Sequence, residues 1–259
     1  MRRGGRAAWA LLALVAGAGV SMAGVQETSH GGILRGPSHA KRIALEFTGH
    51  EYAEGATVIL DQLARRGAKA SFFFTGDFLR RAEFAPIVRR VLAEGHYLGP
   101  HSDKHLLYCG WEASRPTLVT REAFGRDLAD NLAELERFGV RRAAVKYWVP
   151  PYEWFNDETA AWSLEAGLRI VTFTPGTRAN ADYTGEADRN FVPSQAILDS
   201  ILERERADAA GLNGFLLLMH VGAGPGRRDK MHDRFGELLD ALTARGYRLV
   251  RVDELLPLP

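Results

Sequence analysis

The sequence predicts one α/β domain in which about seven parallel strands, covered by helices, form a closed or nearly closed barrel. Helical and strand-like patterns alternate from residue 41 onward, which is typical of a parallel sheet. The helical segments end at glycine, the residue that most easily adopts the left-handed conformation after a helix. The chain of 259 residues contains no convincing internal linker, and its length is normal for a single barrel.

The predicted strands follow one another in a regular order, beginning with the apolar run at 43–47. Glycines that end predicted helices stand at Gly67, Gly95, Gly139, Gly167 and Gly246. The strands that follow these glycines are expected at 70–74, 96–98, 144–148, 168–173 and 247–252. A further apolar strand is expected at 214–219. No glycine-rich phosphate-binding loop follows the first strand, which argues against a nucleotide-binding fold.

The first 23 residues match a secretion signal. Arg2, Arg3 and Arg6 precede an apolar run at 7–20, and small residues follow at the place where a signal peptidase cuts. The apolar run is shorter than the ~20 residues that cross a bilayer. We therefore expect a cleaved signal at 1–23, no stable membrane anchor, and an exported protein that is periplasmic or secreted. Residues 24–40, rich in glycine, serine and histidine, are expected to form a flexible lead-in to the barrel at 41–259.

The charge of the chain argues against a nucleic-acid partner. Removing the three arginines of residues 1–23 lowers the 33 basic residues to 30, against 32 acidic residues. A protein that binds phosphate backbones usually carries a basic excess. Cys109 is the only cysteine, so no disulfide can form within the chain.

Polar side chains gather after the predicted strands. In α/β barrels the catalytic groups lie at the carboxyl ends of the strands. The residues at these ends include His50, Glu51, Asp77, His101, Asp103, His105, Tyr152, Glu153, Trp154, Arg178, Asn180, Asp182 and His220. The starts of the strands carry mostly alanine, lysine and arginine. This asymmetry predicts an enzyme.

His101 and His105 form the sharpest pattern at these strand ends. Neutral imidazole is a common metal ligand, and two histidines four residues apart on a turn can converge on one ion. The alternative is that both rings hydrogen-bond to loop backbone. His220 could likewise be a buried core histidine, and Asp103 and Asp182 could cap helices or turns.

Together these motifs resemble those of the polysaccharide deacetylases, carbohydrate esterase family 4, from residue 41 to about 254. The segments that resemble family motifs are the opening β-α-β unit at 43–76, the H-[ST]-x-x-H metal motif within 95–105, the groove motif at 150–152 and the Leu-x-His motif at 218–220. Asp182-Tyr183 resembles the Asp-Trp pair of the family, with tyrosine in place of tryptophan. The resemblance implies a distorted (β/α) barrel. It also implies a monomeric hydrolase that removes acetyl groups from a carbohydrate, above all one that contains N-acetylglucosamine.

The resemblance further implies a role for each matching residue. His101 and His105 would hold a divalent ion, zinc or alternatively cobalt, which activates water and polarises the acetyl carbonyl. His220 would be the general acid, oriented by Asp182. Tyr152 would contribute a backbone N–H or a wall contact. We expect substrate-binding side chains at Tyr152, Trp154 and Arg178.

The sequence departs from the family at two acidic positions. The family motif T-F-D-D supplies a general base and a third metal ligand, but Thr48 and Gly49 occupy those positions here. The groove motif also carries Val149 where an arginine is usual. In one interpretation, neighbouring groups substitute: His50 binds the metal, and Glu51 or Asp103 acts as the base.

Two other interpretations remain open. The protein could bind sugar without hydrolysing it, using the aromatic residues around Tyr152. It could also be a metal-free glycosidase that uses Glu153 and Asp182 as paired carboxylates, although the histidine pair would then be idle. We favour the substituted deacetylase, because strongly perturbed ionisable groups tend to cluster at functional sites.

Overall fold

The computed structural model describes residues 26–257, so the predicted signal at 1–23 lies outside the described residues. Within this range, no helix combines the length and the apolar character needed to cross a membrane.

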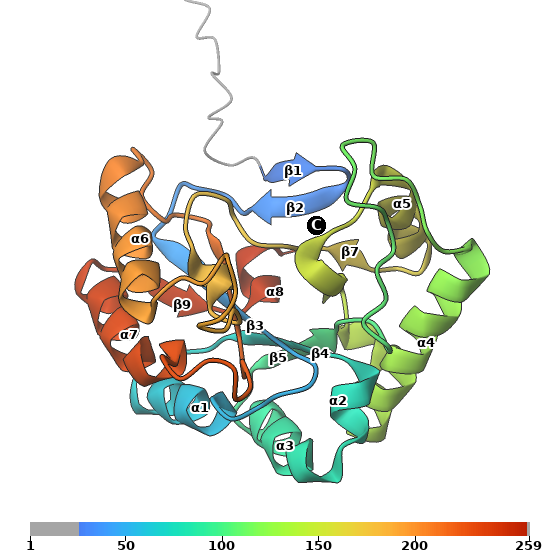
Figure 1. Cartoon of the computed structure of the whole chain (residues 1–259), viewed down its shortest axis with the longest axis horizontal. Coiled ribbons are helices and arrows are strands. Elements are labelled where there is room, and N and C mark those ends of the chain that lie inside the picture. The colour runs from blue at the N-terminus through green and yellow to red at the C-terminus, as the bar shows by residue number, and fades with distance from the viewer. Residues whose placement is uncertain (1–25, 258–259) are drawn as a thin grey trace, which may run out of the picture.

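Parallel strands form the centre of the molecule. Five of them, in the part of the chain that is described, make one sheet in the order β5, β4, β3, β8, with β9 pairing with the first half of β3. These strands are β3 (Arg42–Gly49), β4 (Ser71–Phe74), β5 (Tyr97–Pro100), β8 (Leu216–His220) and β9 (Arg248–Val250). A second parallel pair joins β6 (Tyr147–Trp148) to β7 (Arg169–Ile170). The seven parallel strands found between residues 26 and 257 confirm the predicted fold (Figure 1).

An N-terminal hairpin closes the gap between β7 and β8. It consists of β1 (Glu27–Ser29) and β2 (Gly32–Arg35), paired antiparallel. Ile33 forms a bridge with Val171 beyond β7, and Arg35 forms a bridge with Phe215 beside β8. This differs from the flexible lead-in expected at 24–40. The physical reason is that Ile33 is buried, and Arg35 is buried with hydrogen bonds to the Asn213 and Gly211 carbonyls.

Most helices surround the strands on the outside of the barrel, whereas the short α8 (Val252–Leu255) lies within their ring and packs against apolar residues of the barrel interior through Val252 and Leu255 (Figure 1). Their bounds are α1 (Ala56–Arg65), α2 (Gly76–Arg80), α3 (Ala85–Ala93), α4 (Arg121–Arg137), α5 (Asp157–Glu165), α6 (Ser194–Ala207), α7 (Phe235–Ala244) and α8 (Val252–Leu255). Positive φ angles occur at all of the glycines predicted to end helices: Gly67, Gly95, Gly139, Gly167 and Gly246. The predicted glycine caps are therefore confirmed.

The apolar side chains on the two faces of β3 pack in two different hydrophobic clusters. Leu45 and Phe47 pack into the core between the sheet and the helices. Ala44 packs on the other face, in the barrel interior, with apolar residues of the neighbouring strands. By the alternation of a strand, Glu46 and Thr48 share that interior face. The strand therefore carries Thr48 to the carboxyl end of the barrel interior.

Candidate active site

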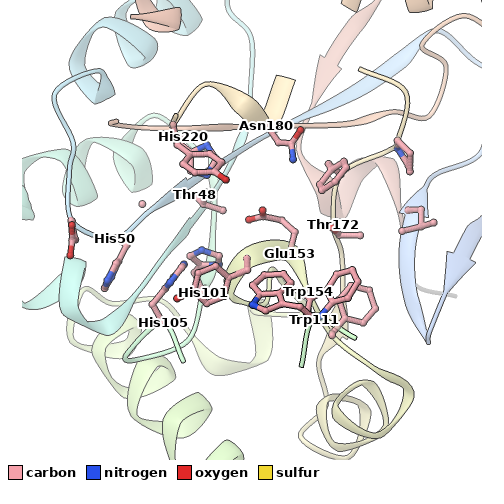
Figure 2. A pocket seen from close by; sticks show the side chains of 18 of the residues that line it. Thr48, His50, His101, His105, Trp111, Glu153, Trp154, Thr172, Asn180 and His220 are labelled. Atoms are coloured by element: carbon pink, nitrogen blue, oxygen red, sulfur yellow. The ribbon is translucent and has the colours of Figure 1, made fainter. Parts of the chain in front are cut away.

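A pocket of about 710 Å³ opens at the carboxyl ends of the barrel strands, the region where the sequence predicted the site. This volume is in the range of small-molecule sites. Residues at or just beyond the ends of five different strands line it: Thr48 and His50, His101 and His105, Glu153 and Trp154, Thr172, and His220 (Figure 2). Residues far apart in the sequence therefore share one cavity.

His101 and His105 form the floor on the β5 side of the pocket. The buried Nδ1 of His101 lies 2.7 Å from the Val149 carbonyl oxygen, which can only accept, so this nitrogen donates. Nε2 has no hydrogen-bond partner among residues 26–257. The two rings lie 5.0 Å apart between centroids, at 66°. Burial, and then the charges of nearby histidines, hold the pKa of His101 well below its usual value and lower that of His105 to about 3. Both imidazoles are therefore neutral, the state in which imidazole binds metals.

The third ligand that the family resemblance implies has no equivalent here. His50 stacks on His105, with 4.7 Å between ring centroids and 12° between planes. An imidazole lone pair lies in its ring plane, so two stacked and nearly parallel rings cannot both point at one ion. The His50 Nδ1 also lies 3.1 Å from the Thr75 hydroxyl. The structure therefore does not bring His50 into a ligand set with His105.

The position of the missing metal-binding acid is also sterically closed. A Cβ atom on Gly49 would lie 2.8 Å from Val221 Cγ2 and 2.9 Å from Phe74 Cδ1. Between residues 26 and 257, no three His, Cys, Asp or Glu side chains are grouped so as to hold an ion. The side chains as placed do not fit the three-ligand site of the family, although His101 and His105 remain together.

His220 and Asp182 form a hydrogen-bonded pair at the end of β8. His220 Nδ1 lies 2.6 Å from Asp182 Oδ1, and the His220 backbone N–H donates to Asp182 Oδ2 over 2.9 Å. Burial alone would lower the pKa of His220, but the charge and hydrogen bond of Asp182, with the charge of Glu153, raise it. The pair combines an oriented imidazole with a raised pKa, which suits a proton donor near neutral pH.

Glu153 is the pocket residue that the sequence analysis assigned only to the glycosidase alternative. It lies at the end of a 3-10 helix, η4 (Pro151–Glu153), and its side chain points into the pocket (Figure 2). Tyr152 and Glu153 have φ angles of 61° and 52°, a left-handed conformation that is uncommon for residues other than glycine. Burial, opposed by the charge of His220 and reinforced by that of Asp182, raises the pKa of Glu153 to about 7.

The remaining predicted site residues divide into two groups. Tyr152 and Trp154 line the pocket, where Trp154 Nε1 donates to the Gly110 carbonyl over 2.8 Å. Glu51 lines the pocket at its exposed rim. Asp103 and Arg178 are not among the lining residues.

Asp103 lies outside the pocket because it has an ionic partner elsewhere. It is buried and accepts hydrogen bonds from both terminal nitrogens of Arg80, over 2.7 and 3.0 Å. Arg178 is exposed on the loop that precedes η5 (Ala179–Ala181). The structure thus brings neither residue to the place where a water or a sugar could meet His220.

Comparison with known proteins identifies the family. The sequence profile for polysaccharide deacetylases matches residues 35–171, which is more than half of the chain. The chain belongs to the polysaccharide deacetylase family. This confirms the family resemblance, and the match covers the motifs at 43–76, 95–105 and 150–152.

Similar members of the polysaccharide deacetylase family are named as deacetylases of peptidoglycan N-acetylglucosamine and of chitooligosaccharides. A peptidoglycan-N-acetylglucosamine deacetylase of Bacillus cereus is 25% identical over 222 residues, covering 85% of this chain and 70% of that protein. A chitooligosaccharide deacetylase of Rhizobium leguminosarum bv. trifolii is 28% identical over 203 residues, covering 74% of this chain and 80% of that protein.

Solved structures of the family share the fold of this chain. PdaA of Bacillus subtilis, a family 4 carbohydrate esterase, superposes with a TM-score of 0.70 at 19% identity, covering 88% of this chain and 85% of that one. A family 4 pseudoenzyme from Bacillus anthracis superposes with a TM-score of 0.67 at 18% identity, covering 88% and 70%. A mutant of that pseudoenzyme is described as having restored activity. The fold therefore occurs both with and without catalysis.

Proposed function

We propose that this protein is a hydrolase that removes acetyl groups from a carbohydrate, by cleaving the amide bond of N-acetylglucosamine in an oligo- or polysaccharide. The observation that carries the proposal is the His220–Asp182 pair, 2.6 Å apart, in the same pocket as the neutral His101 and His105. The names of the family relatives support the substrate class.

Each half of the pocket has a task in this proposal. His220, held by Asp182, gives a proton to the leaving nitrogen of the sugar, because an amine leaves far more readily than an unprotonated amide anion. In this proposal the acetyl group binds beside His101 and His105, which line the pocket. These two histidines are the residues that would hold the divalent ion, zinc or cobalt, that the family resemblance implies, and such an ion would supply polarisation of the carbonyl there.

Aromatic side chains at the mouth of the pocket support a sugar ligand. Trp111, Tyr152 and Tyr183 remain 60%, 45% and 50% exposed, although large aromatic rings are usually buried. Trp111 packs against Tyr152 and Trp154, with 5.7 and 5.4 Å between ring centroids. Such a rim offers flat apolar surfaces on which the faces of sugar rings can stack.

One specific observation favours a second candidate function, sugar binding without hydrolysis. Thr48 and Gly49 replace the acids of the family motif, and no side chain could fit at position 49 without displacing Val221 or Phe74. In that case the sugar would bind in the same pocket and leave it unchanged.

The deciding experiment is acetate release by the purified protein from N-acetylglucosamine oligomers and from acetylated xylan. Acetate from the oligomers supports the amide hydrolase. Binding of the oligomers without acetate supports the sugar-binding candidate. Chelator treatment, followed by zinc or cobalt, tests the predicted ion: loss and return of activity support it, and chelator-resistant activity contradicts it.

We also propose that the protein acts outside the cytoplasm as a monomer. The sequence pattern at residues 1–23 supports export. Terminal sequencing of protein taken from its native cell tests this: a first residue after Ala23 supports export, and an intact Met1 contradicts cleavage. Light scattering on the purified protein measures the oligomeric state.

A further inference from the structure

The end of β3 faces the pocket without an acid. Thr48 pairs with His220 in the register of the neighbouring strands, so the two residues lie next to each other. The Thr48 side chain is buried, and its hydroxyl has no hydrogen-bond partner between residues 26 and 257. A threonine hydroxyl is too weak a base to take a proton from water. Some other group must do this if the pocket hydrolyses an amide.

A carboxylate reaches the same pocket from a different strand. Glu153, on the loop after β6, points toward Thr48 in Figure 2. No hydrogen bond or ion pair to its carboxylate arises from any residue in 26–257. The Glu153 carboxylate is thus unpaired within the described chain, although it lies close enough to His220 for the two charges to interact.

The backbone that holds Glu153 supports a functional role. Both Tyr152 and Glu153 adopt left-handed conformations, each of which costs on the order of 1 kcal/mol for a side chain other than glycine. The result is that Tyr152 lies at the exposed rim while Glu153 is turned inward. Strain of this kind clusters at active sites, where the side chain it places is needed.

The other candidate bases are poorly placed. Asp103 is ion-paired with Arg80 outside the pocket, and Glu51 lies at the exposed rim. Asp182 is occupied by two hydrogen bonds to His220. Glu153 is the carboxylate that shares the pocket interior with His220 and has no other partner among the described residues.

We infer that Glu153 is the general base that replaces the acid missing at Thr48. The inference rests on the proposed hydrolase function. Glu153 takes a proton from water, and the water oxygen forms a bond to the acetyl carbon. The carbon–nitrogen bond then breaks, and its electron pair goes to nitrogen, which takes the proton of His220. The products are a free amine and acetic acid, which releases its proton to solvent to become acetate, and the proton on Glu153 returns to His220 for the next cycle.

The pKa shifts of Glu153 and His220 are compatible with their roles as base and acid. The pKa of Glu153 is raised to about 7, first by burial, so that its carboxylate is a stronger base than an exposed one while still being partly ionised at neutral pH. The pKa of His220 is raised above its usual value once the Asp182 interactions outweigh burial. A raised pKa on both groups suits the transfer of the proton from Glu153 back to His220.

The test compares three proteins: wild type, Glu153→Gln and Glu136→Gln. Glu136 is a matched control, because it is an exposed glutamate on the outside of α4. We expect Glu153→Gln to lower kcat/KM on N-acetylglucosamine oligomers by about 10²- to 10⁴-fold, the usual contribution of a general base. The control is expected to keep wild-type activity. Circular dichroism establishes that the variants are folded.

Two further variants separate a base from a structural residue. Glu153→Ala vacates space for a small carboxylate, so added formate is expected to restore part of its activity and to leave the wild type unchanged. Adding Thr48→Asp to Glu153→Gln is expected to recover activity, because it returns an acid to the β3 end of the pocket. A residue with only a structural role would give neither response.

The outcomes distinguish failure of the role inferred for Glu153 from failure of the proposed hydrolase function. If the wild type releases acetate and Glu153→Gln does so at a similar rate, Glu153 is not the base and the proposed function stands. If the wild type releases no acetate, the proposed function fails, and the role of Glu153 fails with it. Loss of activity in Glu153→Gln together with formate rescue of Glu153→Ala supports the inference.

Discussion

The ends of β3 and β8 lie side by side, yet the side chains at the two ends differ greatly in the chemistry they can perform. At β8, His220 retains an aspartate partner at 2.6 Å and a raised pKa. At β3, Thr48 and Gly49 stand where the family motif has two acids, and the space around Gly49 is filled by Val221 and Phe74. The backbone at both ends still forms the sheet, since the Val221 N–H donates to the Thr48 carbonyl over 2.9 Å.

This contrast shows that the two halves of a site can diverge independently when the backbone keeps them together. Strand pairing depends on backbone groups, so a side chain at a strand end can change without loss of the barrel. A proton donor at β8 needs only His220 and Asp182. A base can be supplied from any loop that reaches the pocket, and the loop that carries Glu153 does reach it.

The largest expected effect comes from removing the proton donor of the β8 end, which is the intact half of the site. His220→Asn keeps a donor toward Asp182 but cannot act as a general acid, so kcat/KM on acetylated oligomers is expected to fall by about 10²- to 10⁴-fold. The matched control is His39→Asn, because His39 is exposed. Retention of most of the activity in His220→Asn would mean that the β8 end is not the working half of the site.

A smaller effect is expected from Asp182→Asn, which keeps the shape of the pair and removes its charge. Charge-assisted hydrogen bonds contribute about 1.5–3 kcal/mol, which corresponds to a fall in kcat/KM of roughly 10- to 100-fold. The control is Asp199→Asn on the exposed face of α6.

The pH profile of Asp182→Asn gives a second, independent measurement. Because Asp182 raises the pKa of His220, its loss lowers that pKa, and His220 loses its proton at a lower pH. The alkaline limb of the kcat/KM profile should therefore move to lower pH. An unchanged alkaline limb would show that His220 is not the group that must carry a proton.

The fold could be predicted from the sequence because it depends on local patterns. Each helix–glycine–strand unit contains its own signal, and the positive φ of residues such as Gly67 and Gly139 confirms it. The hairpin at 27–35 was missed, since only its contacts with Val171 and Phe215, far along the chain, give it order.

The candidate site was predictable where a motif names the residue. The motifs name His101, His105, Asp182 and His220, and the structure brings both pairs to one pocket or its edge. Glu153 was not assigned to the deacetylase site, because its direction depends on a left-handed backbone that the sequence does not indicate.

The stability of a variant at Gly49 tests how tightly the β3 end is packed. Gly49→Ala introduces a Cβ within 2.8 Å of Val221 Cγ2, and overpacking of this kind costs about 1–3 kcal/mol of unfolding free energy. The control is Gly125→Ala in α4, where a Cβ meets nothing within 4 Å, and the change should stabilise the helix by about 0.5–1 kcal/mol. Chemical denaturation measures both. Equal stability of Gly49→Ala and wild type would show that the β3 end can accept a side chain.

The smallest effect is expected at the rim beside β8. The Tyr183 ring lies 5.0 Å from the His220 ring between centroids and is half exposed, so one of its surfaces is available to a sugar. Aromatic contacts contribute about 0.5–1.5 kcal/mol beyond burial, so Tyr183→Ala should raise KM by roughly 2- to 10-fold with little change in kcat. Tyr183→Phe keeps the ring and should leave both constants near the wild type. If Tyr183→Ala instead lowers kcat at constant KM, Tyr183 acts by positioning His220, and the intact half of the site extends from the strand end to the rim.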